Sequence, residues 1–425
     1  MTATDLAPAP LLADDIDAAV AAIVADLIAW RRDLHAHPEL GNREVRTAGI
    51  VAAHLKQLGF DEVRTGVAHT GVVGLLKGKR PGPVVALRAD MDALPVAERT
   101  DVPFASKATT TWNGEQVGVM HACGHDAHVS ILMAVASVLA GLRDRLAGSV
   151  KFIFQPAEEM PPEGEDGGAK MMIAEGALEN PAPGAIFGLH VTSQLPTGVI
   201  GYRSGPTMAS SDSFRILVNG RQTHGAMPWR GVDPIVVSAQ VVLGLQTIVS
   251  RQIDIASEPA VVTIGRIKGG VRQNIIPDSV EMNGTIRTFD ETMRDDVHVR
   301  VTDTAELIAK ASRAGCDVCI TKNYPVTVND AELTAQMLPT LERVAGKARV
   351  KLVPKVTGSE DFAFYQHVVP GLFFFVGVTP PEQDPRTAAS NHSPLFYIDE
   401  AGLPLGARAL AQVAVDWLES QSTPG

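Results

Sequence analysis

The sequence has few cysteines, few aromatic residues and no dense block of basic residues. Only three of its 425 residues are cysteines, and so small and odd a number cannot form a disulfide framework. Acidic residues outnumber lysines and arginines, 48 against 37, and the formal net charge is −11. A nucleic-acid partner is therefore not expected. The small number of cysteines favours a reducing compartment, the cytoplasm.

Targeting and membrane signals are also missing. The first residues, MTATDLAPAP, contain neither a basic segment nor an apolar core, so no signal peptide is expected. No uninterrupted apolar run approaches the roughly 20 residues that a membrane span needs. Apolar residues make up 45% of the chain and charged residues 20%, a mixture typical of globular proteins. The chain is too long for one ordinary core, so we expect two domains.

Four short apolar segments are each followed, directly or after a loop, by polar residues. These segments are 84–87, 152–154, 186–189 and 373–376. Apolar runs of this length, separated by helical segments, predict buried parallel strands. The predicted fold class is therefore α/β, with a mainly parallel sheet covered by helices. Because ligands bind beyond the carboxyl ends of such strands, the polar residues that follow them should form one site.

The pattern changes between about residues 205 and 322. Segments 214–218, 261–267 and 280–289 alternate like half-exposed strands, while 234–249 and 294–313 are helical in character. This order predicts a small α+β domain with an antiparallel sheet, completed by a strand near Cys319. We therefore expect residues 205–322 to be inserted into a discontinuous larger domain, which comprises residues 1–204 and 323–425 and carries the site.

The stretch HACGHDAH, residues 121–128, concentrates three histidines, one cysteine and one aspartate. Cys123 and His125 are candidate metal ligands, because thiolate and imidazole both suit zinc-like ions. His121 and His128 are candidates for supporting those ligands from behind. An alternative is a thiol hydrolase, with Cys123 as nucleophile and His125 as base. A helix N-terminus with a buried cysteine and surface histidines would explain single residues, but it does not explain so dense a cluster.

Further candidates follow the other predicted strands. Glu158 and Glu159, in QPAEE, can divide the work, one holding a metal while the other takes a proton from water. His190 ends an apolar strand, and His392 follows a proline-rich loop. Taken singly, these residues are as readily explained by a solvated surface pair and structural histidines. Their positions at strand ends favour the functional interpretation.

Together, these stretches resemble the metallo-aminoacylase and carboxypeptidase superfamily. The most similar branch contains the hippurate hydrolases, the N-acyl-amino-acid amidohydrolases and the auxin-conjugate hydrolases. The matching motifs occur in family order and span most of the chain. They are LRADMDALPV, MHACGHDAH, FQPAEE, GLHV, GRQTHGAMPWRGVDPI, NIIPDSVEMNGTIRTF, TGSEDFAFY and NHSP.

The resemblance implies metal-dependent hydrolysis of the amide bond of N-acyl-amino acids, releasing a carboxylic acid and a free amino acid. A dipeptidase or carboxypeptidase of the same superfamily is the alternative. Two divalent ions are implied, zinc or manganese, with cobalt or nickel as replacements in vitro. The implied ligands are Cys123, His125, Glu159, His190 and His392. Glu158 would be the general base.

The resemblance implies that two aspartates in RADMD, Asp90 and Asp92, support these ligands without binding the metal ions themselves. The resemblance gives Asp92 the task of orienting a metal-binding residue. Many relatives have a histidine ligand at the position of Asp90. In this chain Cys123 would supply the compensating ligand, as it does in the branch named above.

The inserted domain would be a lid and a dimerisation domain. The resemblance implies that His224 stabilises the oxyanion from across a homodimer, and that Asn274 and Arg287 hold the substrate carboxylate. A planar guanidinium suits that task because it can donate two hydrogen bonds to one carboxylate. The expected partner is a small N-acyl-amino acid or short peptide, with no membrane and no nucleic acid. A non-catalytic binding protein is the rival of a different class, and the complete ligand set and Glu158 argue against it.

Two local features remain. The segment MPPEGED, residues 160–166, separates QPAEE from the glycine-rich turn that follows directly in relatives. It could reshape the pocket or disfavour anionic acyl groups, or it could be only a longer surface loop. The run His35-Ala-His37-Pro-Glu39 looks like a metal site, but the family has a similar stretch without ligand duty, so we expect no catalytic metal there.

Overall fold

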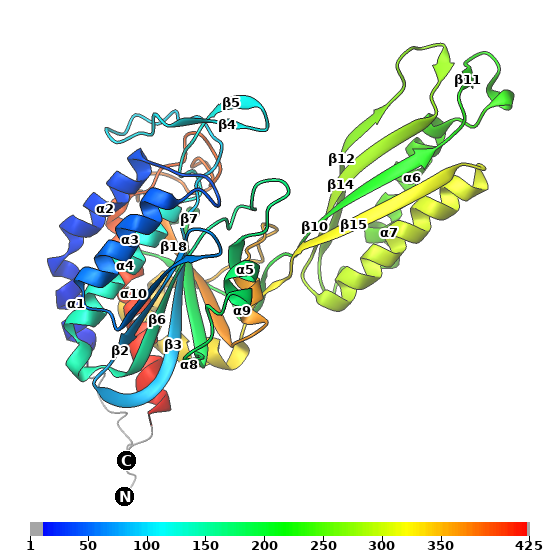
Figure 1. Ribbon diagram of the computed structural model, residues 1–425. Coiled ribbons are helices and arrows are strands. Elements are labelled where there is room, and N and C mark those ends of the chain that lie inside the picture. Colours follow the sequence, from blue (N-terminus) through cyan, green and yellow to red (C-terminus); the bar gives the residue numbers. More distant parts are fainter. Residues whose placement is uncertain (1–11, 423–425) are drawn as a thin grey trace, which may run out of the picture. The chain divides into compact units, whose positions relative to one another are not determined.

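The computed structural model describes residues 12–422 (Figure 1). This part of the chain divides into two compact units. Unit 1 contains residues 12–205, 329–353 and 364–422. Unit 2 contains residues 206–328 and 354–363.

An eight-stranded sheet forms the centre of unit 1, in the order β1-β2-β6-β3-β7-β18-β8-β17. These strands are β1 (Glu62–Val67), β2 (Gly71–Lys77), β6 (Ala147–Gln155), β3 (Arg80–Asp90), β7 (Ala185–Pro196), β18 (Gly371–Thr379), β8 (Ile200–Tyr202) and β17 (Val350–Leu352). The four inner strands β6, β3, β7 and β18 run parallel and contain the four apolar segments singled out above. All nine residues of β18 are buried, as expected for a strand covered on both faces. The predicted fold class is confirmed.

Helices surround this sheet. They are α1 (Ala13–Ala22), α2 (Val24–Ala36), α3 (Val45–Gln57), α4 (His125–Gly141), α5 (Gly168–Ala174), α8 (Ala331–Ala345), α9 (Phe362–Gln366) and α10 (Leu403–Gln421). The long apolar helices α4 and α10 pack against each other and against β3 and β7. Gly124 precedes α4 with φ +96°, a left-handed conformation that favours glycine and lets the HAC segment turn sharply into the helix. A Cβ atom there would also collide with Val191.

Unit 2 contains a four-stranded antiparallel sheet in the order β12-β14-β10-β15, with helices α6 and α7 packed against it (Figure 1). The elements are β10 (Ser211–Asn219), α6 (Pro234–Thr247), β12 (Ala260–Gly269), β14 (Ser279–Thr288), α7 (Glu291–Ala311) and β15 (Gly315–Tyr324). Inward-facing side chains such as Phe214, Ile216 and Val218 alternate along β10. The small α+β arrangement with a last strand through Cys319 matches the sequence prediction. Short strands outside the two main sheets are β4 (Thr109–Trp112), β5 (Glu115–Gly118), β9 (Gly205–Met208), β11 (Thr223–His224), β13 (Ile275–Ile276) and β16 (Thr327–Asn329).

Residues 354–363 belong to unit 2, although the sequence pattern placed them in the larger domain. The reason is pairing between distant segments. The backbone of Val356 bonds to Thr207 and Ala209. The hydroxyl of Ser359 accepts a hydrogen bond from Arg287 at 3.0 Å. No local sequence signal reports such contacts, so the predicted boundary missed this return of the chain.

One helical stretch, Pro234–Gln252, is long and apolar enough by length and composition to cross a membrane. It consists of α6 and the turn that follows it. The expectation that no segment approaches this length was therefore too strict. Val237, Val241 and Leu245 lie on the buried side of this stretch and belong to the core of unit 2. A core helix of this kind meets the same criteria as a membrane span.

Candidate metal centre

The parallel strands bring the predicted ligands of unit 1 to one edge of the sheet. Asp90 is the last residue of β3, and Glu158 and Glu159 are the third and fourth residues after β6. His190 lies within β7, which continues to Pro196, so the prediction that it ends its strand was wrong. His392 lies in the loop that follows β18. Cys123 and His125 come from the start of α4, which packs against β3 and β7. This convergence is expected because adjacent parallel strands release their following residues at the same edge.

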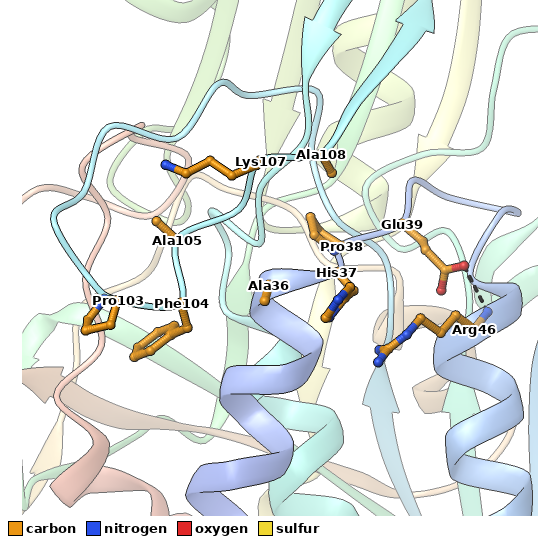
Figure 2. Close-up of a pocket in the computed structure, with 10 residues that line it drawn as sticks. All are labelled: Ala36, His37, Pro38, Glu39, Arg46, Pro103, Phe104, Ala105, Lys107 and Ala108. Atoms are coloured by element: carbon orange, nitrogen blue, oxygen red, sulfur yellow. Dashed lines mark hydrogen bonds between the residues drawn. The ribbon is translucent and has the colours of Figure 1, made fainter.

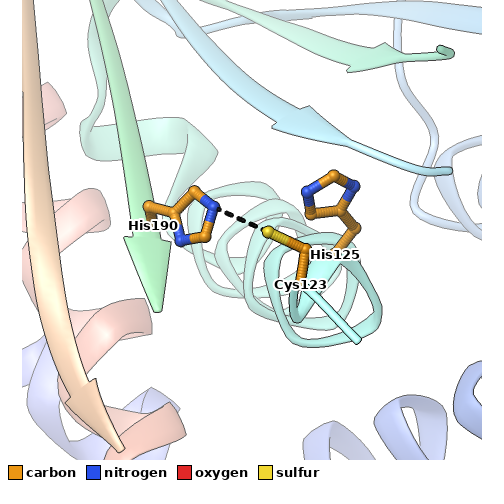
Figure 3. Close-up of side chains that lie close together, drawn as sticks. All are labelled: Cys123, His125 and His190. Carbon is orange, nitrogen blue, oxygen red and sulfur yellow. Dashed lines mark hydrogen bonds between the residues drawn. The ribbon is translucent and has the colours of Figure 1, made fainter. Parts of the chain in front are cut away.

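The described residues form five overlapping groups of possible metal donors, and two of these groups contain Cys123. Sγ of Cys123 lies 3.3 Å from Nε2 of His190 and 3.3 Å from Nε2 of His392 (Figure 3 shows the first contact). Nε2 of His392 lies 2.9 Å from Oε1 of Glu159. Cys123, His125 and His190 form one group, and Cys123, Glu159 and His392 form another; within each group all donor atoms lie within 4.8 Å of one another. Divalent cations would fit this arrangement, because thiolate, imidazole and carboxylate are all ligands of zinc-like ions.

Hydrogen bonds prepare two histidines to ligate through Nε2. Nδ1 of His125 lies 3.2 Å from Oδ1 of Asp92, and Nδ1 of His190 lies 2.7 Å from the carbonyl oxygen of Val191. A proton on each Nδ1 satisfies these acceptors and leaves a lone pair on Nε2. Nε2 of His125 is buried and has no hydrogen-bond partner in the described structure. An orphaned buried lone pair of this kind fits a metal ion.

The side chains of Asp90 and His128 form hydrogen bonds with each other and with neighbouring residues. Oδ1 of Asp90 accepts from Nδ1 of His128 at 2.6 Å, and Oδ2 accepts from Arg88 at 2.6 Å. Nε2 of His128 accepts from the backbone N–H of Val191 at 2.9 Å. These two residues are therefore suited to support the ligands from behind. His121 is buried, neither of its ring nitrogens has a partner in the described structure, and burial lowers its pKa to about 4.

Asp92 connects the histidine of α4 to the glutamate turn. Its Oδ1 accepts from the backbone N–H of Glu158 at 3.0 Å as well as from His125. Its Oδ2 accepts from the backbone N–H of Glu159 at 2.9 Å. Asp92 therefore joins the side chain of His125 to the backbone of both glutamates.

The electrostatics of the cluster favour a bound cation. Burial by itself would lower the pKa of His125, but the carboxylates of Asp90 and Asp92 outweigh it and raise this pKa to about 10. Without a metal ion Nε2 would therefore carry a proton at neutral pH, and a bound cation would take the place of that proton. Burial raises the pKa of the Cys123 thiol, and the carboxylates of Glu159 and Glu158 raise it further. Without a cation the thiol would therefore stay protonated, whereas a nucleophilic cysteine needs a lowered pKa. The histidines that contact Cys123 are His190 and His392, so no contact supports His125 as the base that the thiol-hydrolase alternative named.

Sequence reasoning missed Asn391. Its Nδ2 donates to the carbonyl oxygens of Cys123 at 2.9 Å and Val191 at 3.1 Å, so it ties the ligand loop to α4 and β7. The neighbouring His392 has φ +72°, an uncommon conformation for a residue other than glycine. The only sequence signal for Asn391 was its place beside a candidate ligand.

The three remaining candidates lie in unit 2. His224 pairs with Ile275 in the separate two-stranded sheet of β11 and β13. The backbone N–H of Gly225 donates to the carbonyl oxygen of Asn274, so His224 and Asn274 lie close together in the segment that leads into β14 at Ser279. Arg287 lies near the other end of β14, eight residues after Ser279. At a rise of ~3.3 Å per residue, about 26 Å separate these two residues along the strand. Within one copy of unit 2, Asn274 and Arg287 are therefore not brought together. Burial lowers the pKa of Arg287.

The run His35-Ala-His37-Pro-Glu39 sends its side chains to separate places. Buried His35 contacts Asp126 at 2.8 Å and Glu98 at 3.1 Å. Exposed His37 lines a pocket of about 570 Å³ (Figure 2), and Glu39 accepts a hydrogen bond from the backbone N–H of Arg46 at the start of α3. The pocket is lined by Ala36, His37, Pro38, Glu39, Arg46, Pro103, Phe104, Ala105, Lys107 and Ala108. These three donors form no metal cluster among residues 12–422.

Comparisons with known proteins agree with this geometry. The model of the peptidase family M20/M25/M40 matches residues 86–416. Thermostable carboxypeptidase 2 of Saccharolobus solfataricus is 40% identical over 391 residues, which cover 92% of this chain and 94% of that protein. N-acetylcysteine deacetylase of Bacillus subtilis is 38% identical over 400 residues, which cover 93% of this chain and 97% of that protein.

A solved structure agrees as well. The YXEP protein of Bacillus subtilis, described as a dinuclear metal binding peptidase from the M20 family, is 36% identical with a TM-score of 0.77. The alignment covers 94% of this chain and 99% of that chain. These matches show that the chain belongs to the peptidase family M20/M25/M40 and is a metal-dependent hydrolase of amide bonds.

Proposed function

We propose that the protein hydrolyses the amide bond of N-acyl-amino acids, releasing a carboxylic acid and a free amino acid. The observation that carries this proposal is the pair of overlapping donor groups around Cys123, with the carboxylate of Glu158 beside them. The ligands would be Cys123, His125, Glu159, His190 and His392. Divalent ions bound there would polarise the acyl carbonyl and make a water molecule easier to deprotonate.

Glu158 is the general base in this proposal. It is buried, and its Oε2 lies 3.8 Å from the unpartnered Nε2 of His125, at the edge of the donor cluster. Its carboxylate would take the proton from the attacking water and pass it to the leaving amine. The backbone of Glu158 is held by Asp92, so the side chain starts from a fixed position.

The substrate carboxylate and the oxyanion would be handled by unit 2. The guanidinium of Arg287 suits a carboxylate, and the imidazole of His224 would stabilise the oxyanion. Because His224 and Asn274 lie near the end of β14 that is opposite Arg287, we propose that a second copy of the chain contributes them to the site. The protein would thus act as a homodimer formed through unit 2.

A carboxypeptidase acting on short peptides is the second candidate. It is supported by the 40% identity to a thermostable carboxypeptidase. Both reactions break an amide bond next to an amino acid with a free carboxylate, so the same residues would serve either. We propose zinc rather than manganese, because a thiolate ligand favours the softer ion. A thiolate that must stay reduced also supports a cytoplasmic location.

The experiment is hydrolysis of a panel of N-acetyl-amino acids, N-benzoyl-amino acids and one dipeptide. The purified protein is assayed directly, after chelation, and after addition of Zn, Mn, Co or Ni. We expect activity to disappear with the chelator and to return with one ion, and the preferred substrate to separate amidohydrolase from carboxypeptidase. Activity that persists in protein shown by elemental analysis to be free of metal would contradict the proposal.

Glu158→Gln provides a matched test of the base. It keeps the size of the side chain but removes its ability to accept a proton, so we expect kcat to fall by about 10²–10⁴-fold. Both ions should remain, as measured by elemental analysis. Wild-type kcat in this variant would remove Glu158 from the mechanism.

A further inference from the structure

The turn that carries Glu158 and Glu159 is held by carboxylates at three successive backbone positions. The N–H groups of Glu158 and Glu159 donate to Asp92, as described above. The preceding N–H, that of Ala157, donates to Oε1 of Glu44 at 2.9 Å. Ala157 is buried and has φ +51°, a left-handed conformation that alanine adopts only when its surroundings impose it.

The side chain of Glu44 can bond to Ala157 because Glu39, rather than Glu44, caps the N-terminus of α3. Glu44 directly precedes α3, where a side chain normally accepts from the first N–H groups of the helix, yet it makes no such bond. Glu39 accepts instead from the backbone N–H groups of Arg46 and Thr47, both at 2.9 Å. Glu44 therefore turns inward.

Burying the side chain of Glu44 costs free energy, because the carboxyl group loses its hydration and lies near the charge of Asp92. Its side chain is fully buried, and burial together with the charge of Asp92 raises its pKa to about 8. Its Oε2 accepts from the hydroxyl of Thr70 at 2.6 Å, so both carboxylate oxygens have donors. Thr70 thereby fixes the carboxylate that holds Ala157.

The residues just before Glu44 contact the segment that follows the two glutamates. Nδ2 of Asn42 donates to the carbonyl oxygen of Asp166 at 3.1 Å, and Arg43 forms an ion pair with Glu165 at 2.5 Å. These two acidic residues belong to MPPEGED, so this segment is tied to residues 42–43. Residues 42–44 therefore contact Ala157, which precedes the two glutamates, and residues 165–166, which follow them.

We propose that Glu44 is a positioning residue for the reaction, one that holds Ala157 in its left-handed conformation and so aims the Glu158 carboxylate at the metal centre. The proposal rests on the proposed function of Glu158. If the clamp were lost, Ala157 could relax toward negative φ and the Glu158 carboxylate would move. A displacement of about 1 Å in a catalytic group can cost on the order of 10²-fold in rate.

Two substitutions of matched length separate positioning from simple structural support. Glu44→Gln keeps an oxygen that can accept from Ala157, so kcat should fall by no more than about threefold. Glu44→Met fills the same space without an acceptor, so kcat should fall by about 10²-fold with KM and metal content little changed. Glu39→Ala is the control, because it removes a helix-capping carboxylate nearby and should lower the melting temperature without changing kcat.

A second readout does not depend on activity. Hydrogen exchange of the amides of residues 155–160 should become faster in Glu44→Met and stay as in wild type in Glu44→Gln and Glu39→Ala. If wild type hydrolyses none of the panel substrates, the proposed function fails, but this exchange still tests the clamp. Should Glu44→Met not fold, Thr70→Val, which frees the carboxylate, should show the same faster exchange. Wild-type kcat together with unchanged exchange in Glu44→Met, or in Thr70→Val in its place, would overturn the proposal, as would equal losses of kcat in Glu44→Met and Glu44→Gln.

Discussion

At the scale of single residues, the metal centre is defined by which atoms remain available. HACGHDAH contains four residues that could bind a metal through nitrogen or sulfur, and their spacing does not rank them. In the structure His128 has both nitrogens engaged, whereas His125 keeps a buried Nε2 without a partner. Cys123 contacts two further histidines, one in β7 and one in the loop that follows β18. The hydrogen-bond network therefore removes His128 from the candidate ligands. It does not separate His125 from His121, whose two buried nitrogens also lack partners. Among the described residues, only His125 of these two lies in a donor cluster.

Replacing Cys123 tests its position between the two donor groups. Loss of a residue that merely supports a ligand typically weakens metal binding by about 10–100-fold, so Cys123→Ala, which removes a shared ligand, should cost at least that much. We expect fewer bound ions after gel filtration, measured by elemental analysis, and little activity. Cys316→Ala in β15 is the control and should keep both ions. A full complement of metal in Cys123→Ala would contradict the assignment.

At the scale of elements, a buried ion-pair network holds α7 to the sheet of unit 2. Arg294 of α7 donates to both oxygens of Asp212 in β10, at 2.9 Å and 2.5 Å, and His298 contacts Asp212 at 2.8 Å. Arg294 and Asp212 are both buried. Burial by itself would raise the pKa of Asp212, but His298 and Arg294 outweigh it and lower this pKa. Such a network is costly to break because one charge is left buried without its partner.

Asp212→Asn should therefore destabilise unit 2 by about 3–5 kcal/mol at neutral pH. The free energy of opening can be measured in the full chain by native-state hydrogen exchange of peptides from α7. Asp295→Asn is a matched control on the same helix, since Asp295 and its partner Lys322 are exposed, and it should cost less than about 1 kcal/mol. Equal effects of the two variants would show that the buried network contributes nothing special.

The same network predicts a dependence on pH. A carboxyl group with a lower pKa in the folded than in the unfolded chain adds stability above its unfolded pKa, which is about 4 for aspartate. That stability is lost as the pH falls toward the folded pKa. The difference in opening free energy between wild type and Asp212→Asn should therefore shrink as the pH is lowered below about 4, and a difference that grows would contradict this assignment.

At the scale of the whole molecule, the proposed dimer would cover apolar side chains on the outer faces of α6 and α7. Leu243 is 70% exposed and Leu307 is 63% exposed. The two helices pack side by side, since a Cβ atom on Gly244 of α6 would touch Ile308 of α7. Exposed apolar residues on adjacent helices are typical of an interface.

Leu243→Asp combined with Leu307→Asp should convert the dimer to monomers and remove most activity, because each site would lose the partner's His224. Light scattering during gel filtration measures the mass. Leu352→Asp is the control, because Leu352 is comparably exposed, at 66%, but lies in β17 of unit 1. A monomeric wild type, or a fully active monomeric variant, would contradict the dimer.

Mixing two inactive variants tests the shared site directly. His224→Ala leaves its own Glu158 intact, and Glu158→Gln can supply His224 to that subunit. After random exchange of subunits, half of the dimers would carry one complete site, so about a quarter of wild-type activity should return. No recovery despite proven exchange would place His224 within its own subunit's site.

Local patterns in the sequence determined much of this protein. Apolar runs and their periods of about two and 3.6 residues specified the parallel strands, the inserted α+β unit and the order of their elements. The same patterns placed Glu158 and Glu159 after a strand end, as the structure has them, whereas His190 lies inside β7 rather than at its end. These features were predictable because each depends on residues close together in the chain.

The tertiary structure alone decided what depends on distant residues. Cys123 meets His392, 269 residues away, and Glu44 meets Ala157, 113 residues away. Similar long-range pairing moves residues 354–363 into unit 2 and leaves His125, rather than His128, with a free nitrogen. Local sequence patterns do not encode such contacts, because a hydrogen bond between two distant groups depends on the packing of every element between them.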